Sequence, residues 1–416
     1  MIHRLKHSAE HHLRGLAKPY VKRVLRVGPE EPAYPRLQWL KARVQAVTGL
    51  QPRLYAGYVV EWDDPMHAWC VPFDLCGPRR GEVLVRTIAS ALSTGTEVAV
   101  LSLSPNTEPS FPTRAGYSAV GQIVAVGRGV RHLTVGQLVA GSASHASVVR
   151  LPARVAFPVP DGVAPEEAAF IQLGIITLHG VWRAGFHQGD RVAVLGRGVV
   201  GQLTVQIARA LGAGECISIA PTPARITPAL RQYADHILAT HEVKDAETLL
   251  RDVRADVTFE VSGNPAALHD AVKTTRDDGR VVLLGSSRGT TRDFDFGQLA
   301  ERSITLVGAN IRTLSDTDYR RAGELFLRLI AERKINVGGL VTCEVNPWEA
   351  GWFYRHLSQG TLACAGAVFR WDRLADGDRL RPTRLWRPPD MEAIRAKALQ
   401  QDLVCSDFSA LEEASA

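Results

Sequence analysis

The stretch Arg191-Val-Ala-Val-Leu-Gly-Arg-Gly-Val-Val-Gly201 decides the fold of this chain. Residues 192–195 form a short apolar run that is rich in β-branched valine, as expected of a strand buried on both faces of a parallel sheet. A G-x-G-x-x-G turn follows, and residues 202–211 carry apolar side chains at helical spacing. Strand, glycine turn and helix in this order predict a dinucleotide site, in which N–H groups at the helix start face the phosphates.

The remainder of the chain falls into an all-β part before this turn and an alternating part after it. Short β-type runs before it lie at 54–62, 82–89, 121–127 and 137–140, and a Pro- and Gly-rich turn at 158–162 precedes a helix over 166–180. Candidate strands after it lie at 215–220, 235–239, 256–261, 280–285 and 304–308, mostly separated by helical patterns, with a helix at 316–334 and a strand at 363–370. This pattern predicts an α/β protein with a doubly wound parallel sheet.

Composition limits the class of protein. The chain has 416 residues, 45% hydrophobic and 22% charged, with no apolar run long enough for a membrane span. Six cysteines without a C-x-x-C pair fit a reducing compartment, so we expect a cytoplasmic protein. The net charge is +6, yet residues 1–53 alone hold eleven Lys/Arg against three Glu. The near-neutral remainder does not indicate nucleic-acid binding.

The basic segment 1–52 has three interpretations. As an amphipathic arm it would bind an acidic protein or an anionic membrane surface. Its acid-poor start also imitates an organelle transit peptide. The third interpretation is a helical extension packed on the protein or at a subunit contact, because charged helix faces are usually only solvated.

Several stretches in a fixed order resemble the medium-chain dehydrogenase/reductase superfamily over about residues 54–371. They are Ser93-Thr-Gly-Thr-Glu97, Gly116-Tyr-Ser-Ala-Val-Gly121, Val126-Gly127, Ala193–Gly201, Phe259-Glu-Val-Ser-Gly-Asn-Pro265 and Gly279-Arg-Val-Val-Leu-Leu-Gly285. Together with Thr177-Leu-His-Gly180, the first two resemble the bacteriochlorophyllide dehydrogenase-like subgroup most. The resemblance implies a GroES-like catalytic domain, a Rossmann domain and a homodimer formed through residues 304–310.

The resulting domain prediction has five parts. They are a basic N-terminal extension (1–52), a GroES-like β-rich catalytic domain (53–160), a Rossmann dinucleotide-binding domain (161–310), a return to the catalytic domain (311–371) and a C-terminal tail (372–416).

Zinc members of this superfamily use a Cys, a His and usually a second Cys around an open coordination position. By resemblance these positions fall on Thr94, Tyr117 and Leu173. Leucine has no donor atom, and the loop 141–149 has no cysteine for a structural zinc site. We therefore predict that the protein binds no zinc.

Chemistry without zinc needs groups that orient the substrate and handle one proton. Tyr117 places a phenol where a metal ligand would stand, and Thr96 matches a hydroxyl that relays a proton in zinc members. Glu97 and Ser118 are candidates to assist, and His145 lies in a loop that the resemblance puts near the substrate. The alternatives are a packed aromatic ring at Tyr117, a turn hydroxyl at Thr96 and a structural carboxylate at Glu97.

An NAD site has an acidic residue at the end of the second strand, about 20 residues beyond the glycines. Here that place is Ala220, followed by Thr222 and Arg225, which suit a 2′-phosphate, and Arg197 adds positive charge. We therefore predict NADP(H) in preference to NAD(H), unless Thr222 and Arg225 are ordinary loop residues. The predicted cofactor residues are Gly196, Arg197, Gly198, Val199, Val200, Gly201, Thr177, Thr222, Arg225, Ser262 and Gly285.

These observations predict a zinc-independent oxidoreductase. It would transfer a hydride between NADP(H) and a carbonyl, a secondary alcohol or an activated double bond of a small molecule. One alternative is an NADPH-dependent enone or quinone reductase. Another is a non-catalytic NADPH-binding scaffold whose basic arm binds a partner, because a fold alone does not fix a function.

Overall fold

The computed structural model describes residues 54–107, 109–291 and 294–374. The predictions for segment 1–52 and for nearly all of the tail 372–416 lie outside these residues. Within the described part, no helix is both long enough and apolar enough to cross a membrane.

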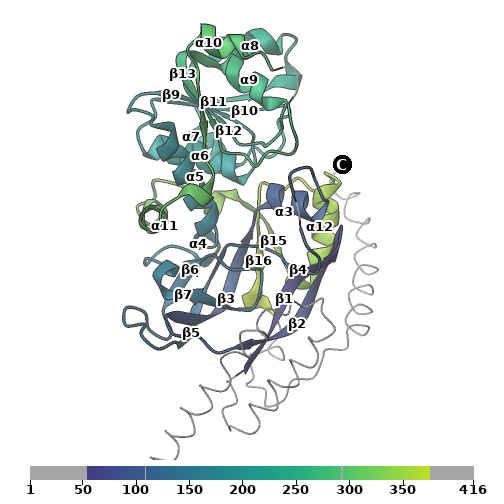
Figure 1. The fold of residues 1–416 in the computed structure, drawn as a ribbon, viewed down its shortest axis with the longest axis vertical. Coiled ribbons are helices and arrows are strands. Elements are labelled where there is room, and N and C mark those ends of the chain that lie inside the picture. Colours follow the sequence, from purple (N-terminus) through teal and green to yellow (C-terminus); the bar gives the residue numbers. More distant parts are fainter. Residues whose placement is uncertain (1–53, 108, 292–293, 375–416) are drawn as a thin grey trace, which may run out of the picture. The chain divides into compact units, whose positions relative to one another are not determined.

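Two sheets make up the β-rich part of the chain (Figure 1). The smaller sheet has the order β2-β1-β4, from β1 (Leu54–Asp64), β2 (His67–Cys76) and β4 (Thr113–Arg114). The larger has the order β15-β16-β3-β5-β6-β8, with β7 also paired to β3. Its strands are β3 (Glu82–Leu92), β5 (Ala119–Val126), β6 (Leu138–Gly141), β7 (Val148–Pro152), β8 (Phe157–Pro158), β15 (Val341–Val345) and β16 (Gly366–Arg370). Residues from both ends of the described chain thus share one sheet, because β16 pairs antiparallel with β3.

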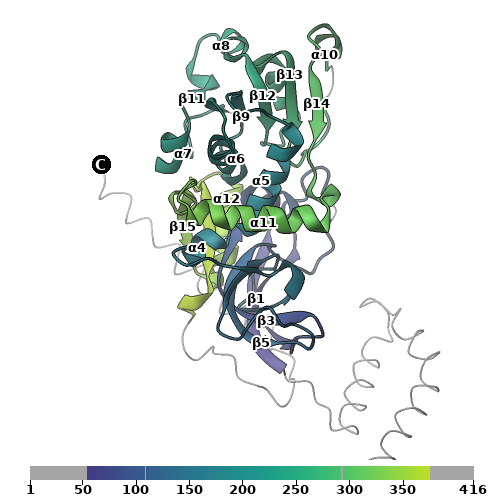
Figure 2. The same cartoon turned by 90° about the vertical axis from the view of Figure 1, so that its left-hand side faces the viewer.

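The alternating part forms one parallel sheet of six strands in the order β11-β10-β9-β12-β13-β14 (Figures 1 and 2). Its strands are β9 (Arg191–Leu195), β10 (Glu215–Ala220), β11 (His236–Ala239), β12 (Ala255–Glu260), β13 (Thr275–Leu283) and β14 (Thr305–Gly308). Counted from β9, this is the 3-2-1-4-5-6 order of the doubly wound dinucleotide-binding fold. The predicted fold class is confirmed, and the order reverses between β9 and β12, where such folds bind ligands.

Side chains of β9 alternate between two apolar layers, one on each face of the sheet. Val192 and Val194 pack in the cluster that includes α5 (Ile171–Ala184) and α6 (Val199–Ala210). Ala193 and Leu195 pack with α8 (Ala246–Val253) and α9 (Ala267–Thr274) on the other face. Burial on both faces explains why this strand is continuously apolar. The other helices are α3 (Thr94–Leu101), α4 (Pro165–Ala168), α7 (Pro228–Tyr233), α10 (Gly297–Glu301), α11 (Asp316–Ala331) and α12 (Ala350–Ser358).

The helices on either side of β9 differ from the sequence prediction. Helix α6 begins at Val199 rather than at residue 202, because Gly198 is its extended N-cap and the glycine turn itself supplies the first helical turn. The helix predicted over 166–180 is two helices, α4 and α5, separated at Ala169 and Phe170. Phe170 is fully buried and both helices belong to the apolar core, so their apolar residues give one continuous pattern in the sequence.

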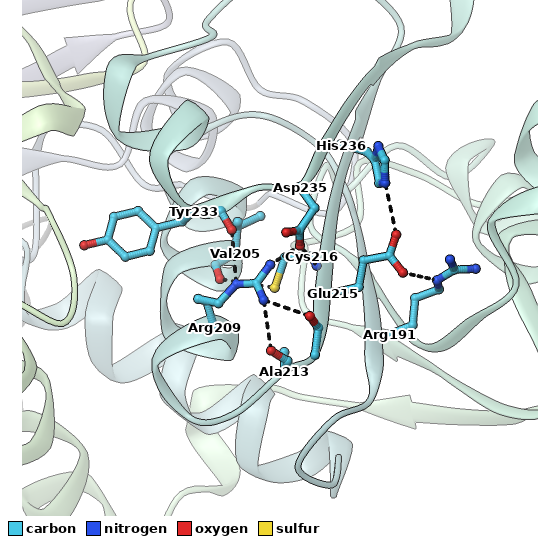
Figure 3. A network of polar contacts seen from close by, with 10 residues as sticks. Arg191, Val205, Arg209, Ala213, Glu215, Cys216, Tyr233, Asp235 and His236 are labelled. Atoms are coloured by element: carbon cyan, nitrogen blue, oxygen red, sulfur yellow. Dashed lines mark hydrogen bonds and ion pairs between the residues drawn. The ribbon is translucent and has the colours of Figure 1, made fainter.

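A polar network closes the amino end of the parallel sheet (Figure 3). Glu215 at the start of β10 pairs with Arg191 of β9 at 2.5 Å and with His236 of β11 at 3.1 Å. Arg209 of α6 pairs with Asp235, which also accepts the backbone N–H of Cys216 at 2.7 Å. Polar contacts therefore link the first residues of β9, β10 and β11. They lie at the edge of the sheet opposite to the carboxyl ends of these strands.

Candidate active site

A cavity of about 1030 Å³ lies at the carboxyl ends of the parallel strands. From the sheet side it is lined by the residues that follow β9, β10, β12, β13 and β14. From the β-rich part it is lined by the start of α3 and by Tyr117. The cavity thus joins the glycine turn, where phosphates are expected to bind, to the predicted catalytic side chains.

The glycine turn has the geometry that a phosphate site requires. Gly196 has φ +115°, a backbone conformation that other residues rarely adopt. A Cβ at Gly201 would lie 2.0 Å from the carbonyl oxygen of Gly196, so only glycine lets the helix pack this close. A Cβ at Gly198 would meet nothing within 4 Å, because this residue faces the open cavity. The N–H groups at the start of α6 therefore remain accessible to an anion.

In the part of the chain that the structure describes, three arginines and no carboxylate line the cavity. Arg197 and Arg225 lie near the end of β10, and Arg288 lies in the loop after β13. Among the described residues, none of the three forms an ion pair with a carboxylate. The charge of the lining is therefore strongly positive, which favours an anionic ligand.

Arg197 is buried beneath the end of β10, with 4% of its surface exposed. Its guanidinium donates to the carbonyl oxygens of Thr222 at 2.7 Å and Leu238 at 2.8 Å. Burial lowers the pKa of this guanidinium, and the more distant charge of Glu242 raises it. The side chain thus places a positive charge under the loop that follows Ala220, at the position where NAD sites carry an acidic residue.

Tyr117 is the aromatic side chain that faces the cavity from the β-rich part. Burial raises the pKa of its hydroxyl to about 12, hydrogen bonds with Ser93 and Thr96 act in the opposite direction, and the charge of Glu97 raises it further. The phenol therefore stays protonated at neutral pH and can donate a hydrogen bond to a ligand oxygen.

Glu97 and His145 lie behind this wall and do not line the cavity. Both are buried, and His145 Nε2 is 3.1 Å from Glu97 Oε2. His145 Nδ1 contacts the hydroxyl of Ser90 at 2.8 Å, and Tyr354 donates to Glu97 at 2.5 Å. Glu97 also accepts the backbone N–H of Ser93 at 2.8 Å, so it fixes the start of α3. The structure thus gives both residues partners other than a substrate.

Some of the other predicted residues line the cavity, and some contact only the protein behind its wall. Ser118 is buried and donates to the carbonyl oxygen of Ala169 at 2.5 Å, and Thr177 donates to that of Leu173 at 2.8 Å inside α5. Neither lines the cavity. The predicted residues that do line it are Tyr117, Thr96, Gly196, Arg197, Gly198, Val199, Val200, Gly201, Thr222, Arg225, Ser262 and Gly285.

Several lining residues were not predicted from the sequence. The polar ones with side chains in the cavity wall are Ser93, Asn106, Ser286, Ser287, Arg288, Asn310 and Thr313. Arg288 had one usable signal, because it follows the carboxyl end of a predicted strand, which is the edge where doubly wound sheets bind ligands. Asn106 had none, because its place depends on a loop of the β-rich part folding onto the residues after β13.

The side chains at the metal-ligand positions do not fit zinc. Thr94, Tyr117 and Leu173 line the same cavity, but leucine has no donor atom and Tyr117 is a protonated phenol. His145, the nearby imidazole, uses both ring nitrogens in the buried network. Zinc prefers thiolate, imidazole and carboxylate ligands, and Thr94, Tyr117 and Leu173 provide none of these.

Two family models match two separate parts of the chain. "Alcohol dehydrogenase GroES-like domain" matches residues 79–161, and "Zinc-binding dehydrogenase" matches residues 199–328. The first covers strands of the larger sheet of the β-rich part, and the second covers the glycine-turn helix and the parallel strands after it. The mixed α/β fold is thus a GroES-like domain joined to a Rossmann sheet.

Known dehydrogenases are similar to parts of the chain. Sorbitol dehydrogenase of Bacillus subtilis (strain 168) is 31% identical over 36% of this chain and 44% of its own length. The chain spans about half the length of the sorbitol dehydrogenases that it matches, from 44% to 56%. L-threonine 3-dehydrogenase of Pyrococcus furiosus is 26% identical over 65% of this chain and 86% of its own length.

Among solved structures, a zinc-binding dehydrogenase of Sinorhizobium meliloti 1021 bound to NADP has the same fold. It is 20% identical, with a TM-score of 0.66 over 77% of this chain and all of its own length. The order of the two matched domains, the strand order of the parallel sheet and the glycine turn agree with these similarities. Both domains of the chain are thus similar to those of alcohol and zinc-binding dehydrogenases, which supports the resemblance to the medium-chain dehydrogenase/reductase superfamily.

Proposed function

We propose that this protein is a zinc-independent oxidoreductase that uses NADP(H) to interconvert a carbonyl and an alcohol group of a small molecule. The observation that carries this proposal is one cavity that joins the glycine turn to Tyr117 and Thr96. Its wall, as far as the described residues form it, holds three arginines and no carboxylate. Such a cavity combines a dinucleotide site with hydrogen-bond donors for a reacting oxygen. The dehydrogenases that resemble the chain in sequence support the reaction type.

The end of β10 supports NADP(H) in preference to NAD(H). Ala220 offers no carboxylate to the ribose hydroxyls, and Thr222 and Arg225 lie beside it in the cavity wall. The guanidinium of Arg197 lies beneath the same loop. A 2′-phosphate would add negative charge where the wall is positive, whereas an acidic residue there would repel it.

The nicotinamide supplies or accepts the hydride when it is bound. The glycine turn and the N–H groups at the start of α6 would hold the phosphates. Tyr117 would donate a hydrogen bond to the substrate oxygen and pass its proton to the alkoxide, which is a stronger base than the phenolate. Thr96 and Ser93, hydrogen-bonded to Tyr117, would orient the phenol and return the proton from solvent.

The proposal that the enzyme works without zinc rests on the side chains at Thr94, Tyr117 and Leu173, which do not form a suitable set of metal ligands. In this enzyme the Tyr117 hydroxyl would polarise the substrate oxygen, a task that the metal performs in zinc members as a Lewis acid. The predicted roles of Glu97 and His145 change accordingly, because both would hold α3 in place instead of exchanging protons with a substrate.

Domain boundaries at residues 53, 161 and 311, a homodimer and the bacteriochlorophyllide dehydrogenase-like subgroup remain part of this proposal. The pairing of β16 with β3 supports a return of the chain to the catalytic domain. The position of β14 at the edge of the parallel sheet supports a subunit contact through residues 304–310, because an edge strand leaves backbone groups open to pairing.

We expect the purified protein to bind NADPH at least about tenfold more tightly than NADH, a difference of about 1.4 kcal/mol. Ala220→Asp should reverse this preference, because its carboxylate would repel the 2′-phosphate and accept the ribose hydroxyls. Fluorescence titration with each cofactor measures both affinities. The control is Gln359→Glu, which adds a negative charge at an exposed position outside the cavity. Binding of neither cofactor by the wild type would instead support a non-catalytic scaffold.

Tyr117→Phe should lower kcat by about 100-fold while leaving the NADPH affinity unchanged, because it removes one hydroxyl that acts in the reaction. Steady-state turnover and cofactor titration measure the two effects. Because the pKa of Tyr117 is raised to about 12, this hydroxyl should cause no loss of carbonyl-reducing activity as the pH rises to about 10. If the carbonyl-reducing activity of the wild type instead rose below a pH of about 10 as the Tyr117 phenol lost its proton, Tyr117 would not act as the hydrogen-bond donor.

A further inference from the structure

Arg288 lies at the end of the cavity opposite to the other two arginines. It follows β13, whereas Arg197 and Arg225 lie around the end of β10. In the sheet, β9 and β12 stand between these two strands. Neighbouring strands are about 4.8 Å apart, so the two groups of positive charge lie on the order of 14 Å from each other along the sheet.

The loop of Arg288 is fixed against the β-rich part. Asn106 Nδ2 donates to the carbonyl oxygens of Ser287 at 3.3 Å and Gly289 at 3.1 Å. Arg288 Nη2 donates to the carbonyl oxygen of Gly95 at 3.2 Å, and Nη1 donates to the Ser286 hydroxyl at 3.0 Å. The guanidinium is therefore held beside the start of α3, in the wall that also carries Thr96 and Tyr117.

Arg288 and Tyr117 face the same end of the cavity. Burial lowers the pKa of the Arg288 guanidinium, and its electrostatic interaction with Tyr117 raises it. A guanidinium has five N–H donors, and the two contacts with Gly95 and Ser286 leave several for a ligand. Among residues 54–107, 109–291 and 294–374 no carboxylate pairs with this half-buried guanidinium.

The cofactor does not supply the missing anion at this end. Its phosphates are expected at the glycine turn after β9, and a 2′-phosphate at the end of β10. The nicotinamide end of a dinucleotide carries no negative charge. The remaining candidate is the substrate, which must lie against Tyr117 if this hydroxyl contacts the reacting oxygen.

We infer that the substrate is a hydroxy acid or an oxo acid, and that Arg288 binds its carboxylate while Tyr117 contacts the reacting oxygen. This inference rests on the proposed oxidoreductase function. A planar guanidinium matches the two oxygens of a carboxylate in parallel hydrogen bonds. A single arginine at this end also suits a singly charged carboxylate better than a phosphate ester, which carries about two negative charges at neutral pH.

Matched ligand pairs test the inference on the full chain, loaded with oxidised NADP for the binding measurements, because that cofactor cannot reduce an oxo acid, and with NADPH for turnover. Each 2-oxo or 3-oxo acid of a short aliphatic series is compared with its amide, which has similar size and no charge. Calorimetry should show that at least one acid binds about 100-fold more tightly than its amide, and its turnover should show the same ratio in kcat/KM. If no acid binds better than its amide, the inference is wrong.

Arg288→Gln should reduce that ratio toward one, and should leave the affinity for NADPH and for the amides within about twofold. Arg288→Lys should retain part of the preference, because it keeps the charge and loses the paired hydrogen bonds. Arg131→Gln, at an exposed position outside the cavity, is the control and should keep the full preference.

Failure of this inference is distinguishable from failure of the proposed function. Loss of NADPH affinity in Arg288→Gln would assign the arginine to the cofactor and overturn the inference, while the oxidoreductase proposal would stand. If the wild type used acids and neutral ketones equally well, the inference about the carboxylate would likewise be wrong and the oxidoreductase proposal would stand. A wild-type protein that binds no NADPH would overturn both proposals.

Discussion

Replacing Gly201 by alanine is expected to lower the affinity for NADPH by about 100-fold, the cost that a shift of about 1 Å often has in a positioned site. The added Cβ would lie 2.0 Å from the Gly196 carbonyl oxygen and 3.1 Å from the side chain of Val261. The first of these contacts is with backbone, so the glycine turn or the start of α6 must move. Cofactor fluorescence measures the affinity, and urea unfolding verifies that the variant folds.

Gly198→Ala separates cofactor contact from packing. Its Cβ would meet no protein atom within 4 Å, and φ is −77°, so the backbone is not strained. We expect a loss of stability of about 1 kcal/mol, because alanine is a poorer N-cap than glycine. The affinity for NADPH should nevertheless fall about tenfold, because the methyl group would stand where the phosphates approach. If Gly201→Ala folds and binds NADPH like the wild type, the phosphates do not bind at this turn.

Glu97→Ala is expected to cost at least about 3 kcal/mol of stability, because three buried donors lose their acceptor and each unsatisfied group costs about 1–3 kcal/mol. The change leaves His145 Nε2, the Tyr354 hydroxyl and the Ser93 N–H without their acceptor. Each of these groups is buried, so water cannot readily replace the carboxylate. Urea unfolding followed by tryptophan fluorescence measures the loss.

Glu97→Gln and an exposed pair provide the controls. Glutamine keeps the shape and one acceptor oxygen, so its cost should be smaller than that of alanine and should report the value of the charge. Glu324→Gln removes the exposed partner of Arg320 on α11 and should cost no more than about 0.5 kcal/mol. An alanine variant as stable as the wild type would show that Glu97 does not hold α3 in place.

The same carboxylate gives stability a dependence on pH. Burial raises the pKa of Glu97, but the charge of His145 and hydrogen bonds from His145, Tyr354 and Ser93 outweigh it, and the pKa lies below its ordinary value of 4.5. A lowered pKa in the folded state contributes stability that is present above 4.5 and is lost as the pH falls through the folded pKa. Glu97→Gln should therefore lose less stability than the wild type on acidification below that value.

Local rules were sufficient to predict the glycine turn that lines one side of the cavity. The residues around β9 specify strand, turn and helix by adjacent positions in the chain, and the glycines are required by contacts within the turn itself. The absence of an acidic residue at Ala220 is likewise read directly from the position that ends β10. Sequence-adjacent constraints of this kind need no knowledge of distant segments.

The substrate half was predicted less well, because it is assembled from distant segments. Tyr117 and Thr96 line the cavity, but Glu97 and His145 turn away into a network completed by Tyr354, which lies 257 residues from Glu97 in the chain. No local pattern indicates that pairing. The same holds for Asn106, which is bonded to residues about 180 positions later.

The sequence by itself therefore determined the doubly wound sheet and the glycine turn, because period, turn residues and strand ends are local properties. The tertiary structure alone decided that β16 pairs with β3 and that Glu97 and His145 contact each other in the core. It also decided that Arg288 and Tyr117 line one cavity, with no carboxylate paired to Arg288 in the part of the chain that the structure describes. These contacts join residues that lie far apart in the sequence, so they are fixed by side-chain packing over the whole described chain and not by local pattern.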